Sequence, residues 1–238
     1  ERNASLEPEA SGTQYRAGKV SGRKINVPMG GGADQFLVST PQGLALVEAG
    51  AAGLHLEHVQ TQDGGTFTIL SLDEVQAHCL PLDGEVLDAA LDEAALGTAA
   101  YLLGVAEQAF SLTLEYLGTR RQFGQAIGSF QALQHRAVDL KLQLALWRAS
   151  LVAAAATFDS GAPVAQRQAA VSRAKARAAD ASLLITRQAV QMHGAIGYTD
   201  ECDIGLYLRK AMTLANLYGS SALHRRRYDA CTPGLIEV

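Results

Sequence analysis

From residue 83 onward the apolar residues recur at three- and four-residue spacing, and this period constrains the fold more than any other feature. Such residues share one face of an α-helix. The pattern predicts helices over 83–118, from about 133 to 159, from 163 to about 192, and over about 203–230. Four helices with short connections indicate an antiparallel four-helix bundle. The first helix is defined by Leu87, Leu91, Ala94, Thr98, Leu102, Val105, Ala109, Leu112 and Tyr116.

Residues 14–82 have a different pattern, with short alternating runs rich in Val and Gly. They predict strands at 15–20, 36–38, 44–47, 54–59, 66–70 and 75–80. Asp63-Gly64 is a hairpin signal between two of them. Residues 1–13 have no period and predict a loose lead-in. The expected fold class is therefore α+β, with a small antiparallel β-domain at 14–82 followed by the bundle at 83–238.

Composition excludes several classes of protein. The net charge of −4 gives no sign of nucleic-acid binding. Three cysteines without CxxC spacing, Cys79, Cys202 and Cys231, argue against a disulfide framework or a metal site. No leader pattern opens the sequence, and no apolar run approaches the length of a membrane span. We expect a cytoplasmic protein that binds neither nucleic acid nor membrane.

Two motifs combine small residues with polar groups near predicted helix ends: Thr119-Arg-Arg-Gln-Phe-Gly124 and Gln191-Met-His-Gly-Ala-Ile-Gly-Tyr198. Small residues let a backbone approach a bulky ligand. An arginine beside them can hold a phosphate by a charge-assisted contact. Together they predict a surface for a phosphate-bearing cofactor. The alternatives are that Arg120 is a cation at a helix C-terminus and that the second motif is an ordinary helix end.

These motifs resemble the two signatures of acyl-CoA dehydrogenases. The first continues from Gly124 through Ile127, Phe130-Gln131, Gln134-His135 and Asp139, and the second continues through Leu206-Tyr-Leu-Arg-Lys-Ala211. The family has an N-terminal helical domain, a middle β-domain and a C-terminal four-helix bundle. The resemblance covers the last two, over about residues 14–230, and we expect the N-terminal helical domain to be absent.

The resemblance implies FAD as cofactor and an acyl-CoA thioester as substrate. It also implies an electron-transfer acceptor and a homo- or hetero-oligomer, a dimer of dimers or an α2β2 assembly with a second dehydrogenase subunit. In the family, FAD lies between the β-domain of one subunit and the bundle of its neighbour. By this resemblance Arg120 faces the FAD pyrophosphate, and Gln122 and Phe123 line the adenosine. The residues that approach the adenine and ribose are Gln191, Gly194 and Ala195.

The catalytic base is missing from both of its usual positions. The family reaction removes a proton from Cα of the thioester while hydride passes to the flavin, which requires a carboxylate. One usual position holds Tyr218, and a phenol is a poor base at neutral pH. The other falls on Ala94. The weak candidates are Tyr218 itself and the neighbours of Ala94, Asp92 and Glu93, whose side chains are turned by about 100° for each residue of shift along a helix.

The β-domain also departs from the family, because Asn26-Val27-Pro28 replaces the Trp-x-Thr that covers the flavin ring. Three hypotheses stay open. The chain is a non-catalytic partner that completes a neighbour's FAD site, or an active enzyme whose displaced base is Asp92, Glu93 or Glu201. In the third it is a structural or binding module that has lost flavin. The acyl group would be a fatty acid or a steroid side chain.

Overall fold

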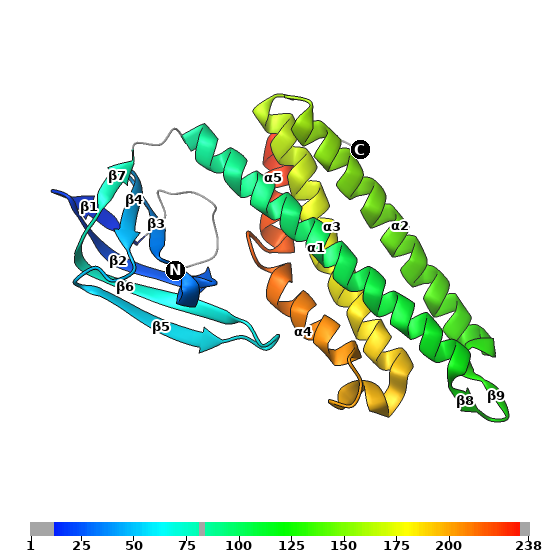
Figure 1. Cartoon of the computed structure of the whole chain (residues 1–238). Helices are drawn as coiled ribbons and strands as arrows, with labels where there is room; N and C mark the ends of the chain where they lie inside the picture. The colour runs from blue at the N-terminus through cyan, green and yellow to red at the C-terminus, as the bar shows by residue number, and fades with distance from the viewer. Residues whose placement is uncertain (1–11, 81–83, 234–238) are drawn as a thin grey trace. The chain divides into compact units, whose positions relative to one another are not determined.

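The computed structural model describes residues 12–80 and 84–233 (Figure 1). Contacts divide the chain into two compact units, Glu1–Leu91 and Asp92–Val238. The predicted lead-in at 1–13 lies mostly outside the described residues. The last of its residues, Thr13, is buried, and its hydroxyl donates to the Ser39 carbonyl oxygen at 2.6 Å.

The first unit contains two antiparallel sheets. A four-stranded sheet has the order β1-β2-β6-β5, and a three-stranded sheet has the order β3-β4-β7. Residues of both sheets form one hydrophobic core, which includes Val20, Phe36, Val47 and Leu70. The strands are β1 (Gln14–Arg16), β2 (Lys19–Pro28), β3 (Gln35–Thr40), β4 (Gly43–Glu48), β5 (Leu54–Gln60), β6 (Thr66–Gln76) and β7 (His78–Leu80).

Strand boundaries differ from the prediction where the chain turns or changes sheet. The predicted strand at 15–20 is two strands, because Ala17 and Gly18 form a turn with φ of 50° and 83°. Strand β2 then continues to Pro28, which the pattern missed. Strand β6 is continuous from Thr66 to Gln76, whereas the prediction broke it after 70. The hairpin predicted at Asp63-Gly64 is confirmed, since β5 and β6 pair on either side of it.

The second unit is helical, and its longest helices share one core. Side chains of Leu102, Leu144, Trp147 and Ile185 meet there, from three different helices. The third helix contributes mainly alanines, so its neighbours approach closely. The helices are α1 (Gly84–Thr119), α2 (Gln131–Asp159), α3 (Val164–His193), α4 (Ile204–Ala215) and α5 (Ser221–Cys231), with 3₁₀ turns η3 (Ile127–Ser129) and η4 (Gly194–Tyr198). A further 3₁₀ turn, η2 (Gly30–Gly32), belongs to the first unit.

The predicted last helix at 203–230 is wrong as a single element, because it breaks between α4 and α5. Tyr218 and Gly219 have φ of 55° and 110°, which no α-helix accommodates. The Ser220 side chain then caps α5 by accepting from the Leu223 N–H at 3.3 Å. The Gly-Ser pair in the sequence is a stop and start signal that the apolar period concealed.

Helix α1 is long and apolar enough to cross a membrane by length and composition, contrary to the prediction that no run approaches that length. Its apolar residues nevertheless have protein partners. Leu102 and Ala106 are fully buried in the core shared with α2 and α3. Packing within the bundle therefore accounts for part of the apolar character of this helix.

Candidate functional site

The two signature motifs meet at one end of the bundle. The Tyr116 ring, near the end of α1, stacks on the His193 ring at the end of α3, with centroids 4.5 Å apart and planes 21° apart. His193 is buried, and its Nδ1 lies 2.8 Å from the Ala189 carbonyl oxygen, to which it donates. This histidine therefore holds the ends of α1 and α3 together by packing.

A short hairpin follows α1 and was not predicted. Strands β8 (Arg121–Gln122) and β9 (Gln125–Ala126) pair across a turn at Phe123-Gly124. Both turn residues have positive φ, 53° and 79°. Two such residues match the turn type whose twist suits a two-residue hairpin. A glycine midway between two short polar runs was the available signal.

Phe123 lies at the tip of this hairpin and is 90% exposed. Its only ring contact within the described residues is edge-on to Phe130, at 6.1 Å between centroids. A large apolar side chain is rarely this exposed, and a non-glycine residue with positive φ is also uncommon. The hairpin therefore presents an aromatic ring to whatever covers this end of the bundle.

The other predicted cofactor residues are also exposed at this end. Arg120 and Gln191 have exposed side chains, with no hydrogen bond or ion pair to any residue in 12–80 or 84–233. Gly194 has φ of 69°, and no atom lies within 4 Å of the position that a Cβ would take. Gln122 and Ala195 are exposed as well. Unpaired donors beside an open backbone suit an anionic, ring-bearing ligand such as FAD.

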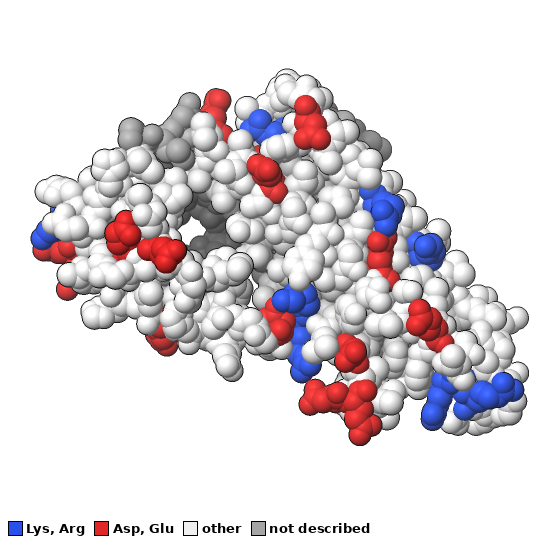
Figure 2. Space-filling model, in the orientation of Figure 1, with Lys and Arg blue, Asp and Glu red and all other residues white. Residues whose placement is uncertain are grey.

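Charge is unevenly distributed around this end. Figure 2 shows basic side chains gathered at the β8–β9 end of the bundle, where Arg120 and Arg121 are exposed. Acidic side chains gather nearby, over the segment between η4 and α4. Exposed Asp200, Glu201 and Asp203 belong to that segment. A diphosphate would be drawn to the hairpin side rather than to the η4–α4 side.

Asp92, one of the candidate bases, lies in a buried ion-pair cluster. Its carboxylate is fully buried, with Oδ1 accepting from Arg227 Nη1 of α5. Arg167 Nε of α3 lies 3.7 Å from Oδ2. Two guanidinium groups therefore contact the carboxylate that a substrate would need to reach. The arrangement favours a structural role, tying α1 to α3 and α5.

The remaining candidates have little support as bases. Glu93 and Glu201 are exposed, and neither side chain makes a hydrogen bond within the described residues. Tyr218 is half-buried in the break between α4 and α5. Its carbonyl oxygen accepts from His224 Nε2 at 2.8 Å. No carboxylate stands at either position where the resemblance places the base.

Two buried residues that the sequence analysis missed hold the α4–α5 break. Lys175 Nζ donates to the carbonyl oxygens of Ala215 at 2.8 Å and Gly219 at 3.1 Å. Burial lowers the pKa of Lys175 to about 8 and the pKa of His224 to about 4. At Gly219 a Cβ would lie 2.7 Å from His224 Nε2, so only glycine fits. A lone lysine on the Ala-rich face of α3 was the signal.

The β-unit shows why Asn26-Val27-Pro28 differs from a flavin-covering segment. Strand β2 has a register shift between Lys24 and Val27. Asn26 is exposed in that shift with φ of 57°, a conformation that asparagine tolerates. Pro28 has no N–H to donate. Within residues 12–80 and 84–233, no three His, Cys, Asp or Glu side chains are close enough to hold a metal ion.

Relatives of known sequence match more than half of this chain. Acyl-CoA dehydrogenase IpdE2 of Mycolicibacterium smegmatis is 41% identical over 139 residues, which are 58% of this chain and 42% of that protein. The short-chain specific acyl-CoA dehydrogenase of Clostridium acetobutylicum is 27% identical over 224 residues, 87% of this chain and 58% of that protein. This chain therefore spans less than two thirds of the length of either relative.

Solved structures extend the likeness over both units. A variant of the Tcur3481-Tcur3483 steroid ACAD is 31% identical, with a TM-score of 0.83 over 92% of this chain and 61% of that chain. The ChsE4-ChsE5 complex from Mycobacterium tuberculosis is 26% identical, with a TM-score of 0.85 over 96% and 65%. A family model described as the C-terminal domain of acyl-CoA dehydrogenase matches residues 84–229. Because that match covers more than half of the chain, the chain belongs to the acyl-CoA dehydrogenase family.

Proposed function

We propose that this chain is a flavoprotein subunit that completes the FAD site of a neighbouring subunit in an acyl-CoA dehydrogenase. The carrying observation is the end of the bundle where Arg120 and Gln191 are exposed and unpaired beside the open backbone of Gly194. The Tyr116–His193 stack fixes the two helix ends relative to each other. Such a preorganised surface suits a ligand held chiefly by a second chain.

FAD would be held there by residues of both motifs. The Arg120 guanidinium would pair with the pyrophosphate, and Gln122 and Phe123 would lie along the adenosine. The backbone at Gln191, Gly194 and Ala195 would approach the adenine and ribose. The bound flavin would accept the hydride in α,β-dehydrogenation of the acyl-CoA. This chain's own contribution would be to bind and orient it.

The non-catalytic version of this role has the better support. Tyr218 stands at one position of the base and Ala94 at the other, and Asp92 is engaged by two arginines. In the β-unit, Asn26 and Pro28 offer neither an indole nor a donor amide. Both losses affect the flavin and substrate side of this chain, while the surface for a partner's FAD is intact.

The assembly would be an α2β2 dimer of dimers with a second dehydrogenase subunit, working in the cytoplasm with an electron-transfer acceptor. The names of two similar structures, a steroid ACAD with two components and the ChsE4-ChsE5 complex, support a two-subunit assembly. A steroid side-chain acyl-CoA is the first substrate to test, and a fatty acyl-CoA the second.

The test is flavin stoichiometry in the complex purified with the partner dehydrogenase subunit. We expect half an FAD per chain, and weak FAD binding by this chain alone. Arg120→Gln should weaken FAD retention by about tenfold or more, because a charge-assisted contact is lost. Arg121→Gln, the neighbouring exposed arginine, is the matched control. Acyl-CoA turnover by this chain alone would exclude the non-catalytic role.

A binding module that has lost flavin is the second candidate, favoured by Asn26 and Pro28 in the β-unit. It predicts a colourless complex in which neither Arg120→Gln nor Arg121→Gln changes any property of the assembly. A yellow complex in which Arg120→Gln alone releases flavin would reject it.

A further inference from the structure

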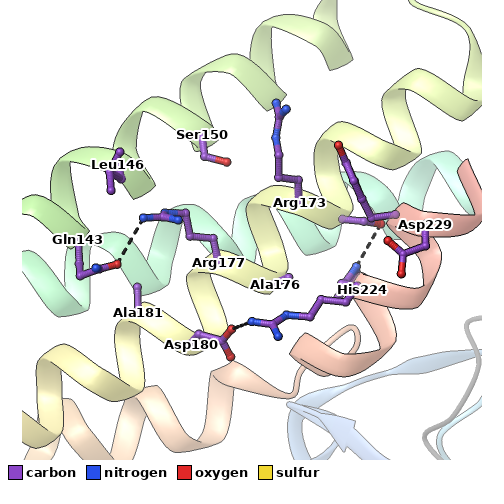
Figure 3. Close-up of a pocket in the computed structure, with 13 residues that line it drawn as sticks. Gln143, Leu146, Ser150, Arg173, Ala176, Arg177, Asp180, Ala181, His224 and Asp229 are labelled. Carbon is purple, nitrogen blue, oxygen red and sulfur yellow. Dashed lines mark hydrogen bonds and ion pairs between the residues drawn. The ribbon is translucent and has the colours of Figure 1, made fainter. Parts of the chain in front are cut away.

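A groove of about 610 Å³ opens between α2, α3 and α5, about three helical turns or more from Gln191 along α3 (Figure 3). Its residues play no part in the proposed FAD surface. Arg173 and Arg177 project into it from successive turns of α3, and Gln143 and Ser150 from one face of α2. Residues four or seven apart share a helix face, so each helix presents a continuous wall.

Two polar atoms in this wall are buried without a hydrogen-bond partner. Arg177 Nη2 donates to Gln143 Oε1 at 3.3 Å, as Figure 3 shows, but Arg177 Nε has no acceptor among the described residues. The Ser150 hydroxyl is likewise buried and without a partner there. Buried donors in folded proteins nearly always have an acceptor. Both residues line the groove, so an acceptor held in the groove would satisfy these two donors.

The charged side chains around the groove give a net positive charge beside Arg177. Arg225 Nη2 donates to Asp180 at 2.6 Å, which neutralises that carboxylate. Arg173 makes no ion pair within the described residues, and it lies one turn from Arg177. Asp229 is exposed at the α5 side and opposes an anion there. The attractive position for an anion therefore lies between α2 and α3, beside Arg173 and Arg177, which form no ion pair with any described residue.

We propose that this groove binds an anionic group, a carboxylate or a phosphate, between Arg173 and Arg177. The anion accepts from Arg177 Nε and from the Ser150 hydroxyl, and Arg173 adds a second positive charge. Leu146 and Ala181 form part of the apolar lining. This site is independent of FAD, so it stands or falls separately from the proposed function.

The test titrates the full chain with sodium phosphate and, separately, sodium citrate, each against NaCl at matched ionic strength. Binding is followed by calorimetry and by the thermal midpoint. We expect saturable binding of at least one anion, weakened about tenfold or more by Arg177→Gln because a charge-assisted donor is lost. Arg177→Lys should give an intermediate affinity, since it retains charge but loses Nε. A response to one probe alone identifies the preferred group.

Arg187→Gln is the matched control, because Arg187 is an exposed arginine of the same helix that lies outside the groove lining. It should bind the probes as the parent chain does. Circular dichroism and the midpoint without anion check that each variant folds. Equal binding by Arg177→Gln and Arg187→Gln would overturn the site. So would responses no larger than that to NaCl, which would mean that water satisfies Arg177 Nε.

Discussion

Two regions of the helical unit use polar side chains in opposite ways. At the β8–β9 end, Arg120 and Gln191 are exposed and unpaired. Along the inner faces of α1, α3 and α5, Asp92, Lys175 and His224 are fully buried, and each contacts protein partners. The first region has exposed donors without acceptors, and in the second each buried side chain has a hydrogen bond or ion pair to protein. Burial and pairing separate a binding surface from a structural cluster.

Two side chains of the buried region stabilise the break between α4 and α5. Lys175 and His224 between them contact the backbone of Ala215, Tyr218 and Gly219, the residues around the α4–α5 break. A buried cation is costly unless carbonyl oxygens surround it. These two residues therefore hold the segment where the family places a catalytic base, although this chain has Tyr218 there.

Asp92→Ala should give the largest effect in this comparison. Removing the carboxylate leaves Arg167 and Arg227 facing each other without their shared partner. We expect a loss of about 3–5 kcal/mol in the free energy of unfolding, measured by urea titration. Glu93→Ala, one position along the same helix and exposed, should change it by less than about 0.5 kcal/mol. Similar values for the two would mean that the cluster contributes no net stability.

Acid should destabilise the buried region through His224, whose pKa burial lowers to about 4 from the ordinary 6.5. Between these values the unfolded chain binds the proton and the folded chain does not. Stability is therefore full above pH 6.5 and falls as the pH drops to 4. The slope is about 1.4 kcal/mol per pH unit, or about 3 kcal/mol in all.

The measurement is the difference between the parent chain and His224→Gln, by urea titration at several pH values. Glutamine cannot titrate, so its curve should lack this contribution while retaining that of the carboxylates. Parallel curves between pH 4 and 6.5 would show that His224 carries its proton in the folded chain. Lys175 does not interfere, because its pKa of about 8 keeps it protonated throughout this window.

The sequence was sufficient for the fold and for the motifs, but not for how the groups pair. The apolar period predicted α1, α2 and α3 closely, because each buries one face over many turns. It missed the α4–α5 break, where the chain turns at Tyr218 and Gly219. The turn is stabilised by a hydrogen bond from Lys175 to the Gly219 carbonyl oxygen, and Lys175 lies 43 or 44 residues earlier in the sequence. It left Asp92 as a candidate base, because the two arginines that bind its carboxylate come from α3 and α5 and are distant in the sequence. Pairings between distant segments leave no local pattern.

Phe123→Ala should have the smallest effect on stability and is the sharpest probe of the exposed region. The side chain is 90% exposed, so its removal should change the free energy of unfolding by less than about 0.5 kcal/mol. If the hairpin lies along FAD, the same variant should release flavin from the complex, because an aromatic contact is lost. Urea titration and flavin content of the purified complex give the two numbers.

Leu142→Ala is the matched control, because Leu142 is a large apolar side chain on α2 that is 55% exposed and belongs to neither motif. It should leave stability and flavin content nearly unchanged. If Phe123→Ala lowers the free energy of unfolding by more than about 1 kcal/mol, the ring stabilises the hairpin through its contact with Phe130. Phe123 would then have a structural role, like the residues of the buried region. Flavin loss at unchanged stability is the result that separates the two regions, since only a ligand-facing residue affects binding without affecting folding.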